Sequence, residues 1–282
     1  MAWLFGWGEN SMQPETIALC QRIGELSPGK VAKPTLVYFD IIGIAWPIRC
    51  LLHLKDIDYE LIKIPIELWM ERDENDVQLL KQSFRNGHVP LYVDLEVGLN
   101  QSHLILEYLM DRHGLDGATL SERFAVREVM LQAYDALFHW NGLFRVNVRL
   151  GLPDKIADAR MNAFMGEGEW PVASNGYDNN LRAFDKYLQA NQAGSGFFVG
   201  NSLTGADLYA FNVLCNWYKA LAPARFSQDY PLLEAFIQKI AAIPGVADYI
   251  AKKQEATTWF PLPHAAMRLT SKEELQGLTG KT

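Results

Sequence analysis

The segment Gly87-His88-Val89-Pro90-Leu91-Tyr92-Val93-Asp94, followed after a short break by Gly98-Leu99-Asn100-Gln101-Ser102-His103-Leu104-Ile105-Leu106-Glu107-Tyr108-Leu109, combines three local signals. A Gly-x-Val-Pro turn leads into an alternating strand that contains Leu91 and Val93. A second short run carries Gln101 and Ser102. A helix begins directly after it, since apolar residues recur there at helical spacing. The segment therefore predicts a turn, two short strands and a helix, in that order.

The Gln101–Ser102 pair at the predicted helix start has two interpretations. A side-chain amide, a hydroxyl and the free backbone N–H groups of the first turn suit a small carboxylate, because the N-terminus of a helix carries partial positive charge. An ordinary N-cap uses the same residue types. The pair by itself leaves both interpretations open.

Composition and charge narrow the class of protein. The chain has 282 residues, enough for one large domain or two modest ones, and its net charge of −7 argues against a nucleic-acid partner. No apolar run reaches the roughly 18 residues of a membrane-spanning helix. Cys20, Cys50 and Cys215 are widely spaced, and the scattered histidines have no metal-ligand spacing, so we expect no disulfide framework and no metal. These features predict a reducing, cytoplasmic location.

Residues 1–33 are predicted to form an N-terminal extension. The segment Met1–Gly8 contains three aromatic residues, and a short helix pattern runs from Pro14 to Leu26. The start of the chain lacks the basic residues and the apolar core of a signal peptide. Its aromatic side chains either enter a membrane interface, dock on a partner protein or pack on the rest of the chain.

Residues 34–115 alternate between strand and helix patterns, which predicts a small mixed sheet with helices. A charged insert, Glu71–Asp76, is expected to be an exposed excursion. In chain order, the expected elements are a strand at Thr35–Phe39, a helix at Trp46–Leu54, a strand at Tyr59–Ile66, a helical turn at Val77–Phe84, strands near Val89–Val93 and Glu96–Leu99, and a helix at Ser102–Arg112.

Residues 118–255 are predicted to form an all-helical bundle, because several segments repeat apolar residues every 3.6 positions. Thr204 can cap a helix while Asp207 returns the bond, and Leu203 and Leu208 form the accompanying hydrophobic staple. Pro244-Gly245 precedes one last helical turn, and residues 256–282 are expected to form an extended tail. The four helical segments are Ala125–Leu137, Asn179–Leu188, Ala206–Leu221 and Leu232–Ile243.

This arrangement resembles a cytosolic glutathione transferase over about residues 34–255. The run Leu36-Val37-Tyr38-Phe39-Asp40-Ile41-Ile42-Gly43-Ile44-Ala45-Trp46-Pro47-Ile48-Arg49 is most similar to the sigma class, which includes glutathione-dependent prostaglandin D synthases. The resemblance implies a thioredoxin-like N-terminal domain, α/β in class, followed by an all-α helical bundle. Both terminal extensions are foreign to the family. A homodimer is implied by the family alone.

The resemblance also implies a glutathione site. Pro90 is expected to be cis, and the main chain of Val89 is expected to hold the cysteinyl unit of the peptide. Gln101 and Ser102 match the positions that take the γ-glutamyl carboxylate. The groups expected near the glycine carboxylate are Trp69, Lys81 and His88. Glutathione is thus the expected co-substrate, with no metal.

Tyr38 is the candidate for thiol activation. Families of this fold use a Tyr at the end of the first strand, or a Ser or Cys at the start of the next helix. No Ser, Thr or Cys lies between Phe39 and Arg49, which leaves the Tyr38 hydroxyl. The phenol would donate a hydrogen bond to the sulfur of glutathione and favour the thiolate. The alternative is a strand aromatic residue that only packs in the core.

A second, apolar substrate is expected between the domains, against the first helices of the bundle. Tyr134, Phe138 and Trp140 are the candidate residues, and His139 and Phe144 lie nearby in the sequence. Each of them could instead belong to the helix core or to a dimer contact.

Three functions remain open at this point. The first is a transferase whose glutathione thiolate attacks an apolar electrophile. The second is a glutathione-dependent isomerase or peroxidase at the same site. The third is a non-enzymatic binding or scaffold protein. It is favoured by Ile44, which stands where the sigma pattern usually has Arg, by the charged insert and by the aromatic N-terminus.

Overall fold

The computed structural model describes residues 13–65, 68–69, 74–149, 153–167, 176–191 and 194–252. Its centre is a four-stranded sheet in the order β2-β1-β3-β4. Strand β1 runs parallel to β2 and antiparallel to β3, and β3 pairs with β4 as a hairpin. The strands are β1 (Thr35–Phe39), β2 (Glu60–Ile64), β3 (Leu91–Val93) and β4 (Gly98–Asn100). All residues of β1 are buried, as expected for an inner strand covered on both faces.

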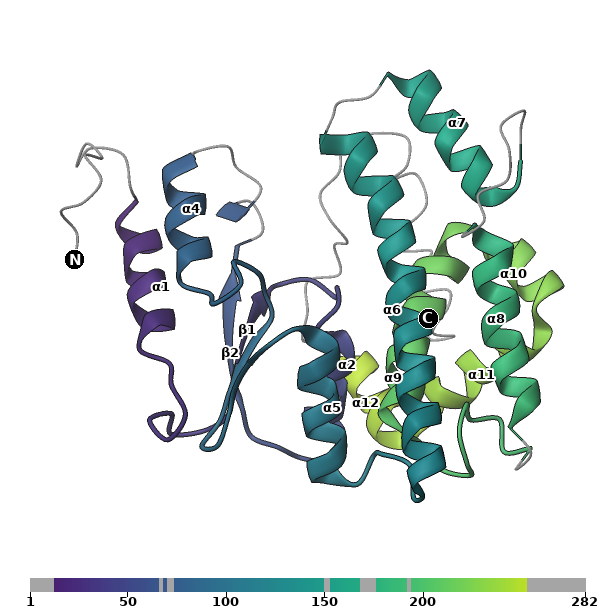
Figure 1. Cartoon of the computed structure of the whole chain (residues 1–282), viewed down its shortest axis with the longest axis horizontal. Coiled ribbons are helices and arrows are strands. Elements are labelled where there is room, and N and C mark those ends of the chain that lie inside the picture. The colour runs from purple at the N-terminus through teal and green to yellow at the C-terminus, as the bar shows by residue number, and fades with distance from the viewer. Residues whose placement is uncertain are drawn as a thin grey trace.

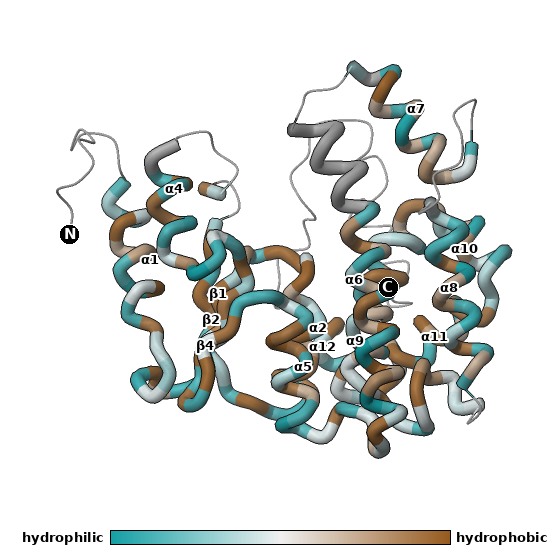
Figure 2. The backbone as a smooth tube through the Cα atoms, viewed as in Figure 1, coloured by the Kyte–Doolittle hydropathy of each residue, from teal (hydrophilic) through white to brown (hydrophobic). Residues whose placement is uncertain are grey.

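Helices cover the sheet on both sides. In Figure 1, α1 and α4 lie on one side, and α2 and α5 lie on the other, next to the C-terminal helices. Figure 2 shows hydrophobic stretches where the sheet meets α2 and α5. These helices are α1 (Pro14–Gly24), α2 (Trp46–Leu54), α4 (Glu74–Gln82) and α5 (Ser102–His113).

The C-terminal part contains helices and loops but no strand among its described residues, and it is organised around α9 (Gly205–Val213). Every residue of α9 is buried, and the helix contacts α2, α5, α6 and α11. It therefore joins the helical part to the sheet part. The other helices are α6 (Leu120–Arg149), α7 (Asp154–Met165), α8 (Tyr177–Ala190), the π-helical segment η1 (Leu214–Lys219), α10 (Pro223–Asp229), α11 (Pro231–Ala241) and α12 (Pro244–Lys252).

Most expected elements are confirmed, with the same bounds for β1 and α2. The long helix expected over Ala206–Leu221 is instead divided, because the π-helical segment η1 follows α9. Helices α7 and α10 were not predicted. The trace in Figure 1 confirms the order of elements, while the domain boundaries at 34–115 and 118–255 stay predictions.

The expectation that Glu71–Asp76 is an exposed excursion is wrong for its last residues. Helix α4 already begins at Glu74, and the Asp76 side chain is buried. The reason is α1, which packs against α4 and donates the Gln13 backbone N–H toward Asp76, 3.5 Å away. Residues 71–73 and Met1–Met12, with its aromatic residues, lie outside the described residues, as does the tail 256–282.

The predicted capping box at the start of α9 is confirmed. The Asp207 carboxylate accepts hydrogen bonds from the Thr204 backbone N–H and hydroxyl, both at 2.8 Å. Its other oxygen accepts the Phe198 backbone N–H, also at 2.8 Å. Asp207 is fully buried, so water cannot replace these bonds.

Replacing Asp207 with Ala should therefore destabilise the protein by about 3 kcal/mol or more, because buried donors lose their acceptor. Urea denaturation followed by circular dichroism measures this loss. The exposed Asp111 on α5 offers a control, since Asp111→Ala should change stability by less than about 0.5 kcal/mol. Equal stability of the two variants would contradict the role given to Asp207.

Candidate active site at the end of the sheet

The candidate site begins with a row of residues at one end of the sheet. The register pairs Val37 with Leu91, and Leu91 with Asn100. The next residues toward this end are Tyr38 on β1, Pro90 before β3 and Gln101 after β4. Residues far apart in the sequence are thereby brought side by side by strand pairing alone.

The turn before β3 has the expected backbone geometry. The Val89–Pro90 peptide bond is cis. The Asn100 side-chain amide donates to the carbonyls of His88 and Pro90, both at 3.2 Å, and so fixes the backbone on either side of Val89. Pro90 is buried while Val89 is half-buried, which leaves the Val89 main chain close to the surface.

Gln101 has a strained backbone. Its φ is 78° and its ψ is 112°, a region that residues with a Cβ rarely occupy. It occupies the N-cap position of α5, yet its side chain makes no cap hydrogen bond. The ordinary N-cap interpretation is therefore wrong for Gln101. The Gln101 side chain is exposed beside the first turn of α5, whose free backbone N–H groups carry the partial positive charge of a helix N-terminus.

The first turn of α5 meets α9. Ser102 is buried, and its side chain lies beside the hydroxyl of Tyr209, which belongs to α9. Burial raises the pKa of Tyr209 well above its usual value, so this phenol stays neutral. Burial also lowers the pKa of His103, which keeps its imidazole largely uncharged at pH 7. The side chains here are therefore neutral.

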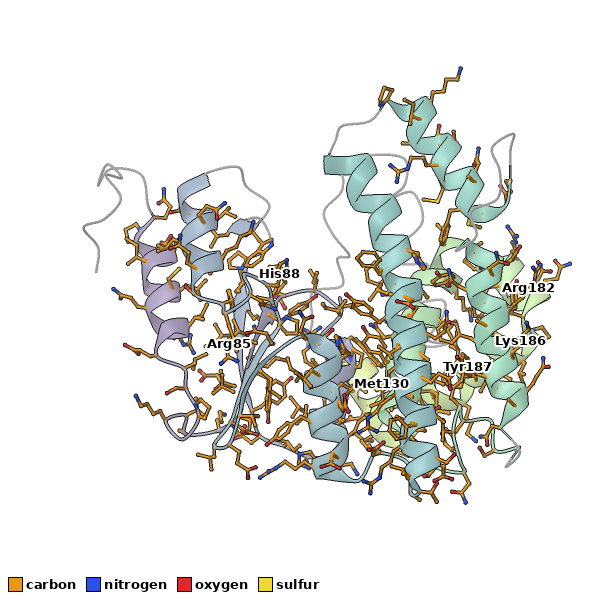
Figure 3. All side chains as sticks on the ribbon, viewed as in Figure 1. Arg85, His88, Met130, Arg182, Lys186 and Tyr187 are labelled. Carbon is orange, nitrogen blue, oxygen red and sulfur yellow. The ribbon has the colours of Figure 1, made fainter. Side chains whose placement is uncertain are left out.

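The residues expected near the glycine carboxylate are brought together only in part. The Lys81 ammonium lies 5.7 Å from the centre of the Trp69 ring, and Trp69 packs edge-on against Phe39. His88 is exposed, with its Nδ1 2.6 Å from the Asn86 carbonyl oxygen. In Figure 3, His88 lies beside the lower end of α4. Lys81 and Trp69 are therefore brought together, whereas the His88 side chain contacts Asn86 instead.

The Tyr38 hydroxyl is held by main chain. Its oxygen accepts the Ile44 backbone N–H at 3.1 Å. Gly43 makes this approach possible, because its φ is +46° and a Cβ at this position would lie 2.4 Å from the Tyr38 oxygen. With its lone pair engaged, the hydroxyl can direct its hydrogen toward a ligand. The Ile44 side chain brings no polar group to this position, but the Ile44 backbone N–H supplies a hydrogen-bond donor.

Arg49 is the buried cation of the site, and the sequence interpretation gave it no role. Its guanidinium donates to the carbonyls of Ile41 at 2.6 Å and Ile42 at 2.7 Å, and to the hydroxyl of Tyr249 at 3.3 Å. It also lies 5.6 Å from the centre of the Tyr38 ring. Arg49 therefore fixes the loop after β1 and supports the ring from behind.

The candidates for a second-substrate site lie on α6. Tyr134 stacks on Phe138 with ring centres 6.2 Å apart and packs against His103 with ring centres 5.3 Å apart. Phe138 is 61% exposed, so it is not a core residue. The side chain of Trp140 lies outside the described residues. Tyr134 thus connects α6 to the first turn of α5.

In the described part of the chain, no group of three or more His, Cys, Asp and Glu residues has a metal-binding arrangement. Among the described helices, none is both long and apolar enough to cross a membrane.

The fold and the row at the sheet end define a thioredoxin-like domain joined to a helical domain. Residues 34–111 match the family model of the glutathione S-transferase N-terminal domain, and residues 171–253 match that of the glutathione S-transferase C-terminal domain. The chain belongs to the glutathione S-transferase family.

Individual relatives agree with this. Glutathione S-transferase 4 of Caenorhabditis elegans is 29% identical over 222 residues, which are 78% of this chain and 97% of the relative. The structure of the Ascaris lumbricoides glutathione S-transferase has a TM-score of 0.65 at 26% identity and covers 80% of this chain and 98% of its own. A monomeric glutathione S-transferase of Necator americanus, with a TM-score of 0.64 at 22% identity, covers 80% and 100%.

Because the Gln101 backbone is strained, replacing this residue should have opposite effects on stability and on glutathione affinity. Gln101→Gly should stabilise the protein by about 1 kcal/mol, because glycine accepts a positive φ without steric cost. The same change should weaken glutathione binding at least about threefold, because it removes the side-chain amide. Thermal unfolding and isothermal titration calorimetry measure the two effects. Unchanged affinity would show that Gln101 does not contact the ligand.

Proposed function

We propose that the protein is a glutathione transferase in which Tyr38 activates the thiol of glutathione. The observation that carries the proposal is the hydrogen bond from the Ile44 N–H to the Tyr38 oxygen at 3.1 Å, next to the cis Val89–Pro90 turn and Gln101. The family of the chain supports the co-substrate, since both domain models are those of glutathione S-transferases.

The peptide is held by complementary groups along the row. The Val89 main chain pairs with the cysteinyl unit as an added strand. The Gln101 amide, the Ser102 hydroxyl and the first turn of α5 take the γ-glutamyl carboxylate. Lys81, with Trp69 and His88 beside it, takes the glycine carboxylate. The sulfur of glutathione then lies beside the Tyr38 hydroxyl, between the positions that take the two carboxylates.

Tyr38 donates its hydroxyl hydrogen to the sulfur and stabilises the thiolate. A thiol with a pKa near 8.5 is only a few per cent ionised at pH 7, and lowering its pKa by ~2 units gives roughly 25-fold more thiolate. The thiolate becomes a weaker nucleophile as its pKa falls, with a slope of ~0.4–0.5, so the net gain is only a few-fold. The larger share of the rate then comes from holding the electrophile beside the sulfur.

The electrophile is expected to be apolar, because Tyr134 and Phe138 offer aromatic surface and the nearby His103 is kept uncharged by burial. Membership of the sigma class and a cytoplasmic location remain parts of this proposal. Product analysis with an organic hydroperoxide or an endoperoxide separates conjugation from the peroxidase and isomerase alternatives.

Tyr38→Phe tests the proposed role of the hydroxyl. The pKa of the bound thiol should rise by about 2 units, and the thiolate at pH 7 should decrease roughly 25-fold. With a chloronitrobenzene as the electrophile, kcat/KM at pH 7 should fall only a few-fold. Ultraviolet absorbance of the thiolate measures the first effect and steady-state kinetics the second.

Tyr187→Phe is the matched control, because Tyr187 lies on α8, far from the sheet in Figure 3. It should leave both measurements unchanged. If Tyr38→Phe keeps the wild-type thiol titration, Tyr38 is not the activating group. If the wild-type protein does not bind glutathione at millimolar concentration, the scaffold alternative replaces the transferase proposal.

We further propose that the protein is a homodimer whose interface includes the outer face of α6. Phe124 and Leu131 are seven residues apart, lie on one stripe of that helix and are 65% and 55% exposed. Leu104 on α5 is 43% exposed as well. An apolar stripe of this kind is typical of a surface that a second copy covers.

Leu131→Asp should convert the dimer to a monomer, because it places a charge in the apolar stripe. Analytical ultracentrifugation measures the change. Leu232→Asp, on the exposed face of α11, should leave the dimer intact. A wild-type protein that sediments as a monomer would refute this part of the proposal.

A further inference from the structure

The loop between β1 and α2 is held in place by hydrogen bonds that its carbonyl groups accept. Three consecutive carbonyls, those of Ile41, Ile42 and Gly43, accept hydrogen bonds from buried side chains. Arg49 takes the first two. The third is taken by Asn212, which donates its side-chain amide to the Gly43 oxygen at 3.1 Å. Asn212 belongs to α9, so this bond comes from the helical domain.

The Gly43 carbonyl is not an arbitrary acceptor. It belongs to the same peptide group as the Ile44 N–H, which donates to the Tyr38 oxygen at 3.1 Å. A peptide group is planar, so fixing its oxygen also fixes the direction of its N–H. A donor on the oxygen polarises the group and makes the N–H a stronger donor in turn.

Asn216 orients the Asn212 amide. Its side-chain NH₂ donates to the Asn212 Oδ1 at 2.9 Å, which turns the Asn212 NH₂ toward Gly43. Asn216 lies four residues further along the chain, in the π-helical segment η1. Asn212 is fully buried and Asn216 half-buried, so water competes little for the inner bond.

We propose that Asn212 is a positioning residue for the Tyr38 hydroxyl, acting through the Gly43–Ile44 peptide group and oriented by Asn216. Hydrogen bonds then run continuously from the Asn216 amide through Asn212 and this peptide group to the phenol. The inference rests on the proposed function, because the last member of the chain is the hydroxyl that meets the sulfur. It makes thiol activation dependent on the helical domain.

The experiment uses the full chain and the thiol titration of bound glutathione. Asn212→Leu removes the donor with little change of volume. Asn216→Asp keeps Asn212 but replaces the donor by an acceptor, so the Asn212 amide should rotate and turn its oxygen toward Gly43. Each variant should reduce the thiolate fraction about threefold at a pH below the thiol pKa. Glutathione affinity should change less than about twofold, since Gln101 and Ser102 are intact.

Asn180→Leu is the matched control. Asn180 is also a buried asparagine that donates to a backbone carbonyl, that of Gly176 at 3.0 Å, but it lies on α8. It should lower stability as Asn212→Leu does, and leave the thiol titration unchanged. A shift of the same size in Asn180→Leu would mean that general destabilisation, and not positioning, changes the thiol.

A double mutant separates the positioning role of Asn212 from the activating role of Tyr38. In Tyr38→Phe the peptide N–H has no phenol oxygen to bind, so adding Asn212→Leu should have no further effect on the thiol. A full additional effect would overturn the positioning role, as would a wild-type titration in both Asn212→Leu and Asn216→Asp. If wild-type protein shows no thiolate at all, the proposed function fails first and this inference fails with it.

Discussion

The buried Asp207 carboxylate is the interaction on which the arrangement of the site depends. It accepts three hydrogen bonds in a fully buried position, from Phe198 and Thr204, and so fixes where α9 begins. All residues of α9 are buried, and the helix touches both parts of the chain. Asp207 is the third residue of α9. By fixing the start of this helix, it also fixes the position of Tyr209 beside Ser102 and that of Asn212 beside Gly43. A folding motif and part of the candidate site thus share one helix.

The candidate site relies on main-chain groups at Ile44 and Val89. The Tyr38 oxygen receives the N–H of residue 44, and every residue except proline supplies that group. The apolar Ile44 side chain therefore leaves this bond in place. Val89 is likewise proposed to use its backbone. A loss of activity could thus not be inferred from Ile44 alone.

Much of the fold could be predicted because its signals are local. The bounds of β1 and α2, the turn before β3 and the Thr204–Asp207 capping box follow from periodicity, proline and spacing. The burial of Asp76 could not be predicted, since it depends on α1, which lies more than fifty residues away. Asn212 was missed for the same reason: nothing near it in the sequence indicates that its amide meets Gly43. The π-helical turn η1 also has no simple pattern.

Helix α1 lies outside the matched domains and changes the exposed border of the sheet. Strand β2 is an edge strand, so one side of its backbone has no neighbouring strand within the sheet. Arg22 of α1 forms an ion pair with Glu60 at the start of β2, which brings a helix beside this edge. An open edge invites a strand from another molecule, and a helix lying there obstructs such pairing. At the Glu60 end of β2, the added helix thus leaves less of this edge open to such pairing.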